Sequence, residues 1–519
     1  MPRIPLATPA LAVAILASAA PLQDFTPRPI EAPPGSFVLA GEGKLHASAV
    51  DVFVHLAGGY DADLVIVSAD GTPKSLGRMA KSGARDATTL GEVPVDAREL
   101  SLLLLEADGI WIEDVPEALS EDSLFVPLLE GVLERGGIVG GQGAGALALC
   151  EGNGTTPGFG LFPGARLEFV SKAGKSKRKE DPPAGDGRID WLIPKETALV
   201  VAHGRKVGAV GKADVHVRIQ GTEAWPERSA TITPQDVFEL TDFAPYDLDL
   251  VAWRRSAQMR QGPTFPAESP AKPVLKKGTL ILSGGGGVQS ETWNRFIDAA
   301  GGKKATFVCI PSGSDYFPGE EPKSYGAGQL RDHGCRDVHV VDPASADRAD
   351  ADSRLHDLLG KATGIWIDGG RTYRVMDALE HTRAHELIRE TLEEGGAVGG
   401  SSAGCQVLGE LLVRGDPRTN RTLFFEGYTT GLGLLPGVVL DAHFLDRDRH
   451  EEFSKLVQEY SQYLGIGVDA DTSLVVEKST AEVLGKASVS FYDLSDGDAE
   501  PVILEAGNTY DLAKRRAKR

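Results

Sequence analysis

The chain has 519 residues, a formal net charge of −20 and four cysteines. This length exceeds one ordinary hydrophobic core and favours two or more domains. The negative charge argues against nucleic acid as a partner, because affinity for a phosphate backbone comes from clustered Lys and Arg. The cysteines have no CxxC spacing and no histidine cluster, so no zinc site is predicted. Two states stay open for them: one disulfide between Cys309 and Cys335, or buried free thiols.

The first 24 residues have the layout of a secretory signal peptide. Arg3 precedes an apolar run, and the segment ends near the small residues Ala17-Ser18-Ala19. We therefore expect an exported protein, secreted or periplasmic; a buried N-terminal helix is the alternative. The apolar run is too short for a permanent anchor, and no later stretch approaches the roughly 18 unbroken apolar residues of a membrane helix, so no membrane span is expected.

Segments of the N-terminal half recur, in the same order, in the C-terminal half. "GSFVLAGEG" at 35–43 parallels "GTLILSGGG" at 278–286, and "ADGIWIEDV" at 107–115 parallels "ATGIWIDGG" at 362–370. "GFGLFPGARLEFV" at 158–170 answers "GLGLLPGVVLDAHF" at 431–444. This pattern predicts one domain duplicated in tandem, at 35–255 and 278–510, with a Pro-rich linker at 256–277 between the copies.

Each predicted copy alternates short β-branched runs with amphipathic stretches such as "SRLHDLLGKA" and "HELIRETLEEGG". That alternation predicts βαβ units around a mainly parallel sheet, with functional groups at the carboxyl ends of the strands. The late stretch "TSLVVEKSTAEVLGKASVSFYDL" instead predicts an antiparallel pair or meander that closes the domain.

A serine in the second copy stands where a nucleophile would be exposed. In "GGAVGGSSAGCQVLGEL" at 395–411, Ser402 lies between a predicted strand and a predicted helix, with small neighbours on both sides. The alternative is a plain helix N-cap. His443, in "DAHFLDRDRHEEF", ends a later apolar run and is a candidate general base; the alternative is a structural histidine. Ala403 and Gly370 are candidate oxyanion donors through their backbone N–H groups, although "IDGG" at 367–370 is also compatible with an ordinary turn.

These segments, in this order, resemble the peptidase family of cyanophycinases and aspartyl dipeptidases, family S51. The matching motifs are "GSSAG" at 400–404, "DAHFLDRDR" at 441–449, "GIGVDADTS" at 465–473 and, in part, "GGRT" at 369–372. The resemblance covers about 278–490. It implies an α/β fold like that of class I glutamine amidotransferases, a flavodoxin-like arrangement, in each of two tandem domains.

The resemblance also implies roles for single residues. Ser402 becomes the nucleophile, His443 the general base and acid, and Gly370 with Ala403 the oxyanion donors. Arg447 and Arg449 are expected to hold a substrate carboxylate; the alternative is surface charge paired with Asp446 and Asp448.

The acid that orients His443 stays open among three residues. Asp416, in the loop after the elbow helix, is preferred, and Asp469 or Asp471 are the alternatives. Ala442 and Thr372 stand where the family has glutamines that help to hold substrate. This departure leaves open whether cyanophycin, an Asp backbone bearing Arg side chains, is the substrate.

The first copy lacks the counterparts of the serine, the histidine and the glycine pair. Gly143 stands in place of Ser402 and Val170 in place of His443, and Asp114 with Val115 replace the Gly369–Gly370 pair. We expect a catalytically silent domain that packs against its twin as a pseudo-dimer or binds substrate. Further homo-oligomers are left open.

The sequence thus predicts an exported serine hydrolase that cleaves peptide or isopeptide bonds near acidic residues by acyl transfer. The expected substrate is a peptide or an Asp-rich polymer, and no metal or organic cofactor is expected. A silent binding protein with the same fold is the main rival. An amidotransferase-like or esterase activity is a third hypothesis, because a fold does not determine a function.

Overall fold

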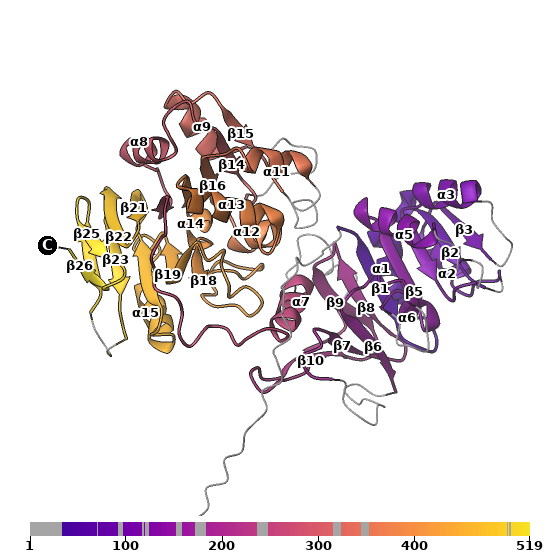
Figure 1. The fold of residues 1–519 in the computed structure, drawn as a ribbon. Helices are drawn as coiled ribbons and strands as arrows, with labels where there is room; N and C mark the ends of the chain where they lie inside the picture. Colours follow the sequence, from indigo (N-terminus) through magenta and orange to yellow (C-terminus); the bar gives the residue numbers. More distant parts are fainter. Residues whose placement is uncertain are drawn as a thin grey trace, which may run out of the picture.

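The computed structural model describes residues 34–518, apart from 70, 92–96, 117–118, 120–123, 152–157, 172–182, 236–245, 247, 315–322, 344–351, 496 and 498–499. The predicted signal peptide lies outside the described residues. Within them, the chain forms two mixed α/β halves that follow one another in sequence (Figure 1).

The N-terminal half is built on an eight-stranded sheet with the order β12-β9-β8-β1-β5-β4-β2-β3. Strands β1, β5, β4, β2 and β3 run parallel, and β8, β9 and β12 continue the sheet in antiparallel pairing. A second sheet has the order β11-β10-β7-β6. The strands are β1 Ser36–Ala40, β2 Asp63–Val67, β3 Asp86–Leu90, β4 Gly109–Ile112, β5 Ile138–Gln142, β6 Ala165–Val170, β7 Ile189–Pro194, β8 Thr197–Ala202, β9 Lys206–Gly211, β10 Val215–Ile219, β11 Arg228–Ile232 and β12 Leu248–Asp249.

The C-terminal half has a nine-stranded sheet with the order β15-β14-β16-β17-β13-β21-β22-β25-β26 and a five-stranded sheet with the order β18-β19-β20-β23-β24. The stretch predicted as an antiparallel pair or meander forms β21, β22 and β23; β21 and β22 are the antiparallel pair, whereas β23 joins the five-stranded sheet. The strands are β13 Thr279–Ser283, β14 Phe307–Ile310, β15 Val338–Val340, β16 Gly364–Ile367, β17 Ala397–Ser401, β18 Gly409–Leu411, β19 Leu435–Ala442, β20 Leu464–Val468, β21 Thr472–Glu477, β22 Thr480–Gly485, β23 Ser488–Tyr492, β24 Val502–Glu505, β25 Thr509–Asp511 and β26 Arg516–Ala517.

The large sheets of the two halves share one strand order. Reading β3-β2-β4-β5-β1-β8-β9-β12 against β15-β14-β16-β17-β13-β21-β22-β25 pairs the strands one for one in chain order. In both sheets a parallel block of five strands is extended by antiparallel strands. The predicted α/β class with mainly parallel sheets is therefore confirmed, and the shared order supports the predicted duplication, which stays a prediction.

Helices cover the parallel strands because the strands are apolar on both faces. In β16, Ile365 and Ile367 join one buried cluster while Trp366, between them, joins the cluster on the other face. The helices are α1 Ala47–Leu56, α2 Leu76–Met79, α3 Ala97–Glu106, α5 Phe125–Glu134, α6 Ala144–Ala148, α7 Leu250–Met259, α8 Ser290–Ala299, α9 Tyr325–Asp332, α11 Ser353–Leu359, α12 Thr372–Leu379, α13 Arg383–Glu394, α14 Ala403–Gln406 and α15 His450–Glu459, with 3₁₀ turns at Gly59–Asp61 and Ala80–Ser82.

Helix α7 joins the two halves (Figure 1). Leu250 and Trp253 belong to the core of the N-terminal half, whereas Val251 and Ala252 belong to the core of the C-terminal half. The helix runs through residue 255, where the sequence predicted the end of the first domain. All four cysteines are free and buried.

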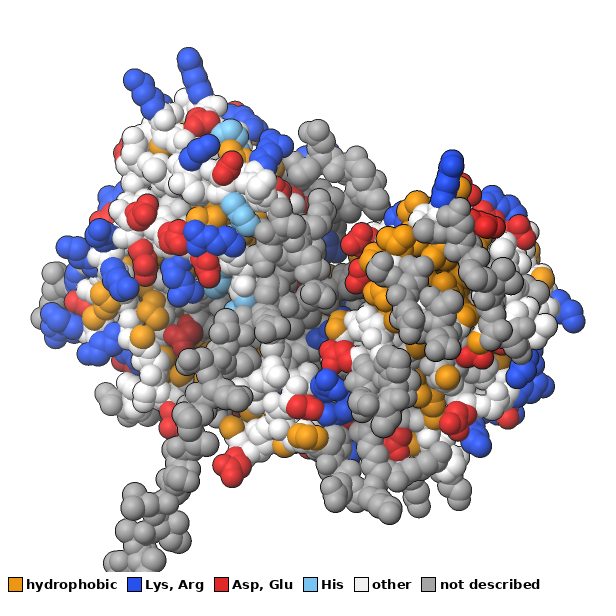
Figure 2. Space-filling model, turned by 45° about the vertical axis from the view of Figure 1, so that its right-hand side comes forward, with side chains coloured by type: hydrophobic (Ala, Val, Ile, Leu, Met, Phe, Trp, Pro, Cys, Tyr) orange, Lys and Arg blue, Asp and Glu red, His pale blue; other side chains and the backbone are white. Residues whose placement is uncertain are grey.

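The surface of the N-terminal half carries a gathering of hydrophobic side chains (Figure 2). Leu102 and Leu105 of α3 are exposed hydrophobic residues in this half. Within the part of the chain that the structure describes, no helix is long and apolar enough to cross a membrane.

Candidate active site

Ser402 lies on a sharp turn between β17 and α14. Its backbone has φ 55° and ψ −116°, a conformation that is unfavourable for a residue with a side chain. Glycines permit the close crossing of strand and helix, because a Cβ atom on Gly400 would lie 2.3 Å from Gly404 O, and one on Gly404 would lie 2.1 Å from Ile367 O. Ser402 occupies the N-cap position but makes no side-chain capping bond. Its half-buried hydroxyl is thus not used to cap the helix.

His443 follows directly after β19, with φ 49° and a side chain that is 15% exposed. Its Nδ1 lies 3.2 Å from Asp446 Oδ2. A proton on Nδ1 donated to this carboxylate leaves Nε2 as the basic nitrogen. The Nε2 atom packs against Gly285, where an added Cβ atom would lie only 2.2 Å away.

The end of β13 brings the serine and histidine loops together. Three consecutive carbonyl groups accept three backbone N–H groups: Ser283 O from Ser402 (3.0 Å), Gly284 O from His443 (2.8 Å) and Gly285 O from Asp471 (2.9 Å). No role for this segment was predicted from the sequence. The available signal was the glycine run "SGGGG" at the carboxyl end of a predicted strand, which is where parallel α/β sheets place functional groups.

The predicted oxyanion donors lie at two neighbouring turns. An added Cβ atom on Gly369 would lie 3.1 Å from Ser402 Cβ, so the Gly369–Gly370 turn adjoins the serine. Gly370 has φ 134°, and an added Cβ atom there would lie 2.0 Å from Gly313 O, so only glycine fits. Ala403 is the first residue of α14. Among the described residues, neither the Gly370 nor the Ala403 N–H has an acceptor, which leaves both for a ligand.

The backbone N–H groups of Ser402 and His443 are bound to adjacent residues, but the two side chains are not hydrogen-bonded to each other in the described structure. Such bonds are often long in an empty site and shorten when substrate binds. The geometry therefore supplies a serine on a strained turn and an imidazole on the adjoining loop.

Asp416, predicted as the orienting acid, is not hydrogen-bonded to His443 in the described structure. Its carboxylate is fully buried and accepts hydrogen bonds from Arg418 (3.0 Å, from both N and Nε) and from Thr422 Oγ1 (2.8 Å). Burial disfavours the charged form, but these hydrogen bonds outweigh it and lower the pKa of Asp416. The carboxylate at His443 is that of Asp446, which replaces Asp416 as the candidate acid.

The two alternative acids support loops instead. Asp469 accepts a hydrogen bond from Leu445 N at 3.2 Å and from Ser488 Oγ at 2.7 Å, and so anchors the segment that follows His443. Asp471 accepts from Gly287 N at 2.6 Å and fixes the glycine run. Both acids thus hold the surroundings of His443 without being hydrogen-bonded to its ring.

The two predicted substrate-binding arginines have different surroundings. Arg449 is buried, with Nη1 2.6 Å from Asp441 Oδ1 and 2.6 Å from Ala442 O. Arg414 and Gln406 also donate hydrogen bonds to Asp441, at 3.0 Å and 2.8 Å. The carboxylate held by Arg449 is therefore internal, which does not support its predicted substrate role. Arg447 is exposed.

The electrostatic environment favours the neutral form of His443. Burial lowers the pKa of His443 most, the positive charge of Arg447 lowers it further, and Asp446 acts in the opposite direction. Neutral imidazole is the form that can accept a proton from a serine hydroxyl. Among the described residues, no group of three His, Cys, Asp or Glu side chains is placed to hold a metal ion.

Comparison with known proteins places this site in a family. The model of peptidase family S51 matches residues 280–484, which include both Ser402 and His443. The cyanophycinase of Synechococcus elongatus is 35% identical over 210 residues, which are 39% of this chain and 62% of the relative. The cyanophycinase of Trichormus variabilis is 32% identical, with 42% and 74% covered, and that of Geminocystis herdmanii is 31% identical, with 43% and 82% covered.

Two solved structures are also similar. A peptidase from an acI-B1 Actinobacterium has a TM-score of 0.37 and 21% identity, covering 46% of this chain and 98% of that one. A putative peptidase E protein from Listeria monocytogenes has a TM-score of 0.31 and 19% identity, covering 40% and 99%.

The identity and coverage of these relatives show which family the chain belongs to. The chain spans less than two thirds of the Synechococcus elongatus relative, but 74% and 82% of the other two cyanophycinases. The chain belongs to peptidase family S51. Its matched part is confined to the C-terminal half.

Proposed function

We propose that this chain is a serine-type peptidase that acts by acyl transfer at Ser402. In this proposal His443 Nε2 takes the proton of the serine hydroxyl as Oγ attacks the scissile carbonyl, and then protonates the leaving amine. The N–H groups of Gly370 and Ala403 stabilise the negative charge that develops on the carbonyl oxygen. Water then releases the acyl group by the same steps in reverse.

One observation carries the proposal: the Ser402 and His443 amides are bound to consecutive carbonyl groups of the β13 end. The backbone under the nucleophile and that under the base are therefore fixed relative to each other before substrate arrives. A helix cap would not explain the side chain that Ser402 keeps on this strained turn, because it makes no capping bond, and a structural histidine would not need Gly285 beneath its ring.

We further propose peptide or isopeptide bonds near acidic residues as the substrate class. The similar cyanophycinases support this class. Arg447, exposed and close enough to lower the pKa of His443, is the cation that meets a substrate carboxylate in this proposal. Arg449 has no part in substrate binding in this proposal, because its guanidinium group is already hydrogen-bonded to Asp441.

The proposal includes export and a catalytically silent N-terminal half. Export is supported by the layout of residues 1–24. Silence is supported by Gly143 at the turn that corresponds to Ser402, and by the buried Val170 at the end of β6, which corresponds to the strand before His443. A tandem duplication is the simplest origin of the shared strand order.

Hydrolysis assays with the purified full chain test this proposal. The substrates are cyanophycin, a panel of Asp-containing dipeptides and matched isopeptides, and Ser402→Ala is the control. Release of amine by the natural chain and its loss in the variant would support the proposal. Equal background rates for both proteins across the panel would contradict it.

A catalytically silent binding protein is the second candidate. It is favoured by Arg449, which is bound internally, and by the lack of a hydrogen bond between Ser402 and His443 in the described structure. In that case Ser402→Ala should leave ligand binding unchanged, and no substrate in the panel should turn over.

A further inference from the structure

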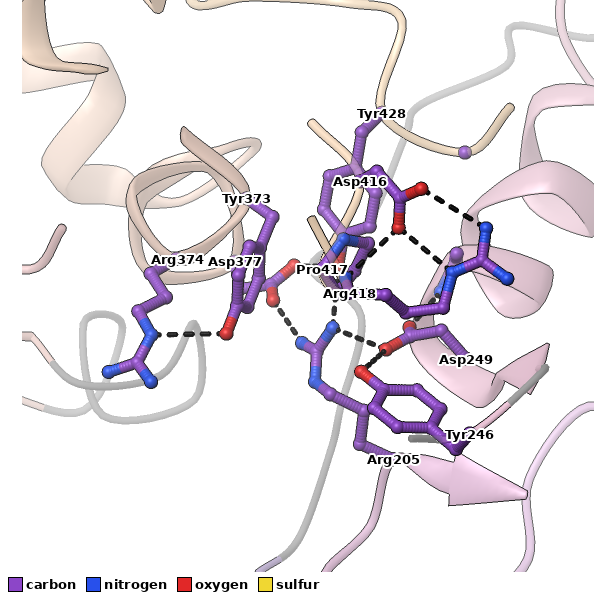
Figure 3. A network of polar contacts seen from close by, with 12 residues as sticks. Arg205, Tyr246, Asp249, Tyr373, Arg374, Asp377, Asp416, Pro417, Arg418 and Tyr428 are labelled. Atoms are coloured by element: carbon purple, nitrogen blue, oxygen red, sulfur yellow. Dashed lines mark hydrogen bonds and ion pairs between the residues drawn. The ribbon is translucent and has the colours of Figure 1, made fainter. Parts of the chain in front are cut away.

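One face of helix α12 in the C-terminal half is held by the N-terminal half. Tyr373, Asp377 and Glu380 are spaced i, i+4 and i+7 along this helix and its C-cap, so they lie on one face. The residues that meet them are Arg205, in the turn between β8 and β9, and Arg255 of α7 (Figure 3 shows the part of this network around Arg205).

Arg205 bridges two carboxylates from different halves. Its Nη2 forms an ion pair with Asp377 Oδ2 of α12, while Nη1 lies 2.9 Å from Asp249 Oδ2 at the start of α7. Nη1 also donates to Tyr428 OH at 3.2 Å, and the guanidinium lies 4.9 Å above the ring of Tyr373. Planar guanidinium groups suit such a site because they donate in several fixed directions at once.

Arg255 makes a second contact one turn further along. Its Nη2 forms an ion pair with Glu380, its Nε donates to Gly427 O at 2.6 Å, and it stacks 4.5 Å above the ring of Tyr428. Tyr428 OH in turn donates to Asp377 Oδ1 at 2.7 Å. Arg255, Glu380 and Tyr428 are buried, so water does not weaken these contacts.

The other end of α12 is the oxyanion turn. Its N-cap, Arg371, follows Gly370, and Arg371 N donates to Gly313 O at 2.7 Å. The Arg371 side chain donates to Asp416 O at 2.8 Å. Between the two ends, Val375 and Met376 are packed in the core of the C-terminal half. A helix of 8 residues, about 12 Å long, therefore connects the contact with the N-terminal half to the turn that carries Gly370.

We infer that the N-terminal half positions the oxyanion turn of the C-terminal half, and that Arg205 is a positioning residue which acts through Asp377 and α12. This inference rests on the proposed hydrolase function. It gives the silent half a role in catalysis without contact to substrate. It also explains why a half-buried and a buried ion pair, Arg205–Asp377 and Arg255–Glu380, meet on α12.

The test compares Arg205→Lys and Arg205→Ala with Arg166→Lys in the full chain. Arg166 is a matched control, because it also bridges two carboxylates, Asp186 and Asp190, but within the N-terminal half alone. The measurement is the reaction of Ser402 with a fluorophosphonate, resolved into its binding constant and its maximal rate. Thermal melting of each variant identifies plain loss of stability.

We expect Arg205→Ala to lower the maximal rate about tenfold while the binding constant changes less than about twofold, because a small displacement of an oxyanion donor slows the reaction more than binding. Arg205→Lys should recover part of the rate, since lysine keeps the positive charge but lacks the planar guanidinium group that donates in several directions at once. Arg166→Lys should leave the maximal rate unchanged. Equal maximal rates for all three variants and the natural chain would overturn the inference.

Amide hydrogen exchange separates this inference from the proposed function. Arg205→Ala should speed exchange at residues 370–379 without speeding it at α13, whether or not the chain is an enzyme. If the natural chain does not react with the probe, the hydrolase proposal fails, and unchanged exchange at 370–379 would then overturn the positioning role as well.

Discussion

Gly143 and Ser402 hold the same backbone conformation in the two halves of the chain. Gly143 has φ 55° and ψ −115°, and Ser402 has φ 55° and ψ −116°. Each N–H donates to the end of the neighbouring parallel strand, Gly143 to Ala40 O at 3.1 Å and Ser402 to Ser283 O at 3.0 Å. The turn is therefore a feature of the fold in both halves. Only the C-terminal half keeps a strained side chain there, which is typical of a functional residue.

Exchanging the two residues should separate stability from reactivity. Ser402→Gly should raise the free energy of unfolding by about 1 to 2 kcal/mol, because glycine adopts this conformation without strain, and should abolish reaction with a fluorophosphonate. Gly143→Ser should lower stability by a similar amount without creating a reactive serine, since Val170 stands where a histidine would be needed. Chemical denaturation and probe labelling check both. A destabilised Ser402→Gly variant would contradict this account of the turn.

The space beneath His443 should tolerate only glycine. Gly285→Ala should reduce the labelling rate about a hundredfold, because the new methyl group would lie 2.2 Å from His443 Nε2 and displace the ring. Gly302→Ala is the control: it has a similar φ, 92° against 98°, but faces open space. Both variants bear the backbone strain, so stability should fall in each. Equal labelling of the two variants would show that the Gly285 contact is irrelevant.

Asp446, and not Asp416, should influence the histidine. Asp446→Asn should lower the rate about tenfold, less than the roughly 10⁴-fold loss known for a buried triad aspartate, because the Asp446 side chain is 44% exposed. Asp416→Asn should instead lower stability, since it weakens the hydrogen bonds to Arg418 and Thr422. Rates and melting curves of the two variants check this division. Loss of rate in Asp416→Asn at unchanged stability would restore the sequence-based choice.

The pH profile should reflect the lowered pKa of His443. The neutral ring is the active form, so a lowered pKa means that activity persists below the ordinary histidine value of about 6.5 and is lost only as the pH falls further. Arg447→Ala removes a positive charge, which should move this acid limb to higher pH. Asp446→Asn removes a negative charge and should move the limb to lower pH. Labelling rates measured against pH test both directions, and a shift of the same sign in both variants would contradict the assignment.

Patterns that depend on local sequence predicted most of the fold. The β-branched runs predicted the parallel strands, and the small residues around Ser402 predicted a tight turn, because both depend on neighbours in the chain. The end of the first domain was harder to predict from the sequence. Residues 250–259 form one helix in which Leu250 and Trp253 enter one core and Val251 and Ala252 enter the other, and no change in composition marks that division.

Side-chain partners were harder to predict than positions. Asp446 is visible three residues after His443, but its pairing with Nδ1 depends on the course of the loop that Asp469 anchors. Arg449 forms an ion pair with Asp441 because the chain turns back after β19 and buries both groups together. The contact of Arg205 with Asp377 joins residues 172 positions apart and has no local signal at all.

The most direct measurement is the mass-spectrometric mapping of a fluorophosphonate adduct on the natural full chain, beside His443→Ala and Gly285→Ala. The account predicts a single adduct at Ser402, lost or greatly slowed in both variants, because the hydroxyl needs the ring above Gly285 as its base. An unmodified Ser402 in the folded natural chain, or labelling that is unchanged in His443→Ala, would contradict the claim that this serine is a catalytic nucleophile.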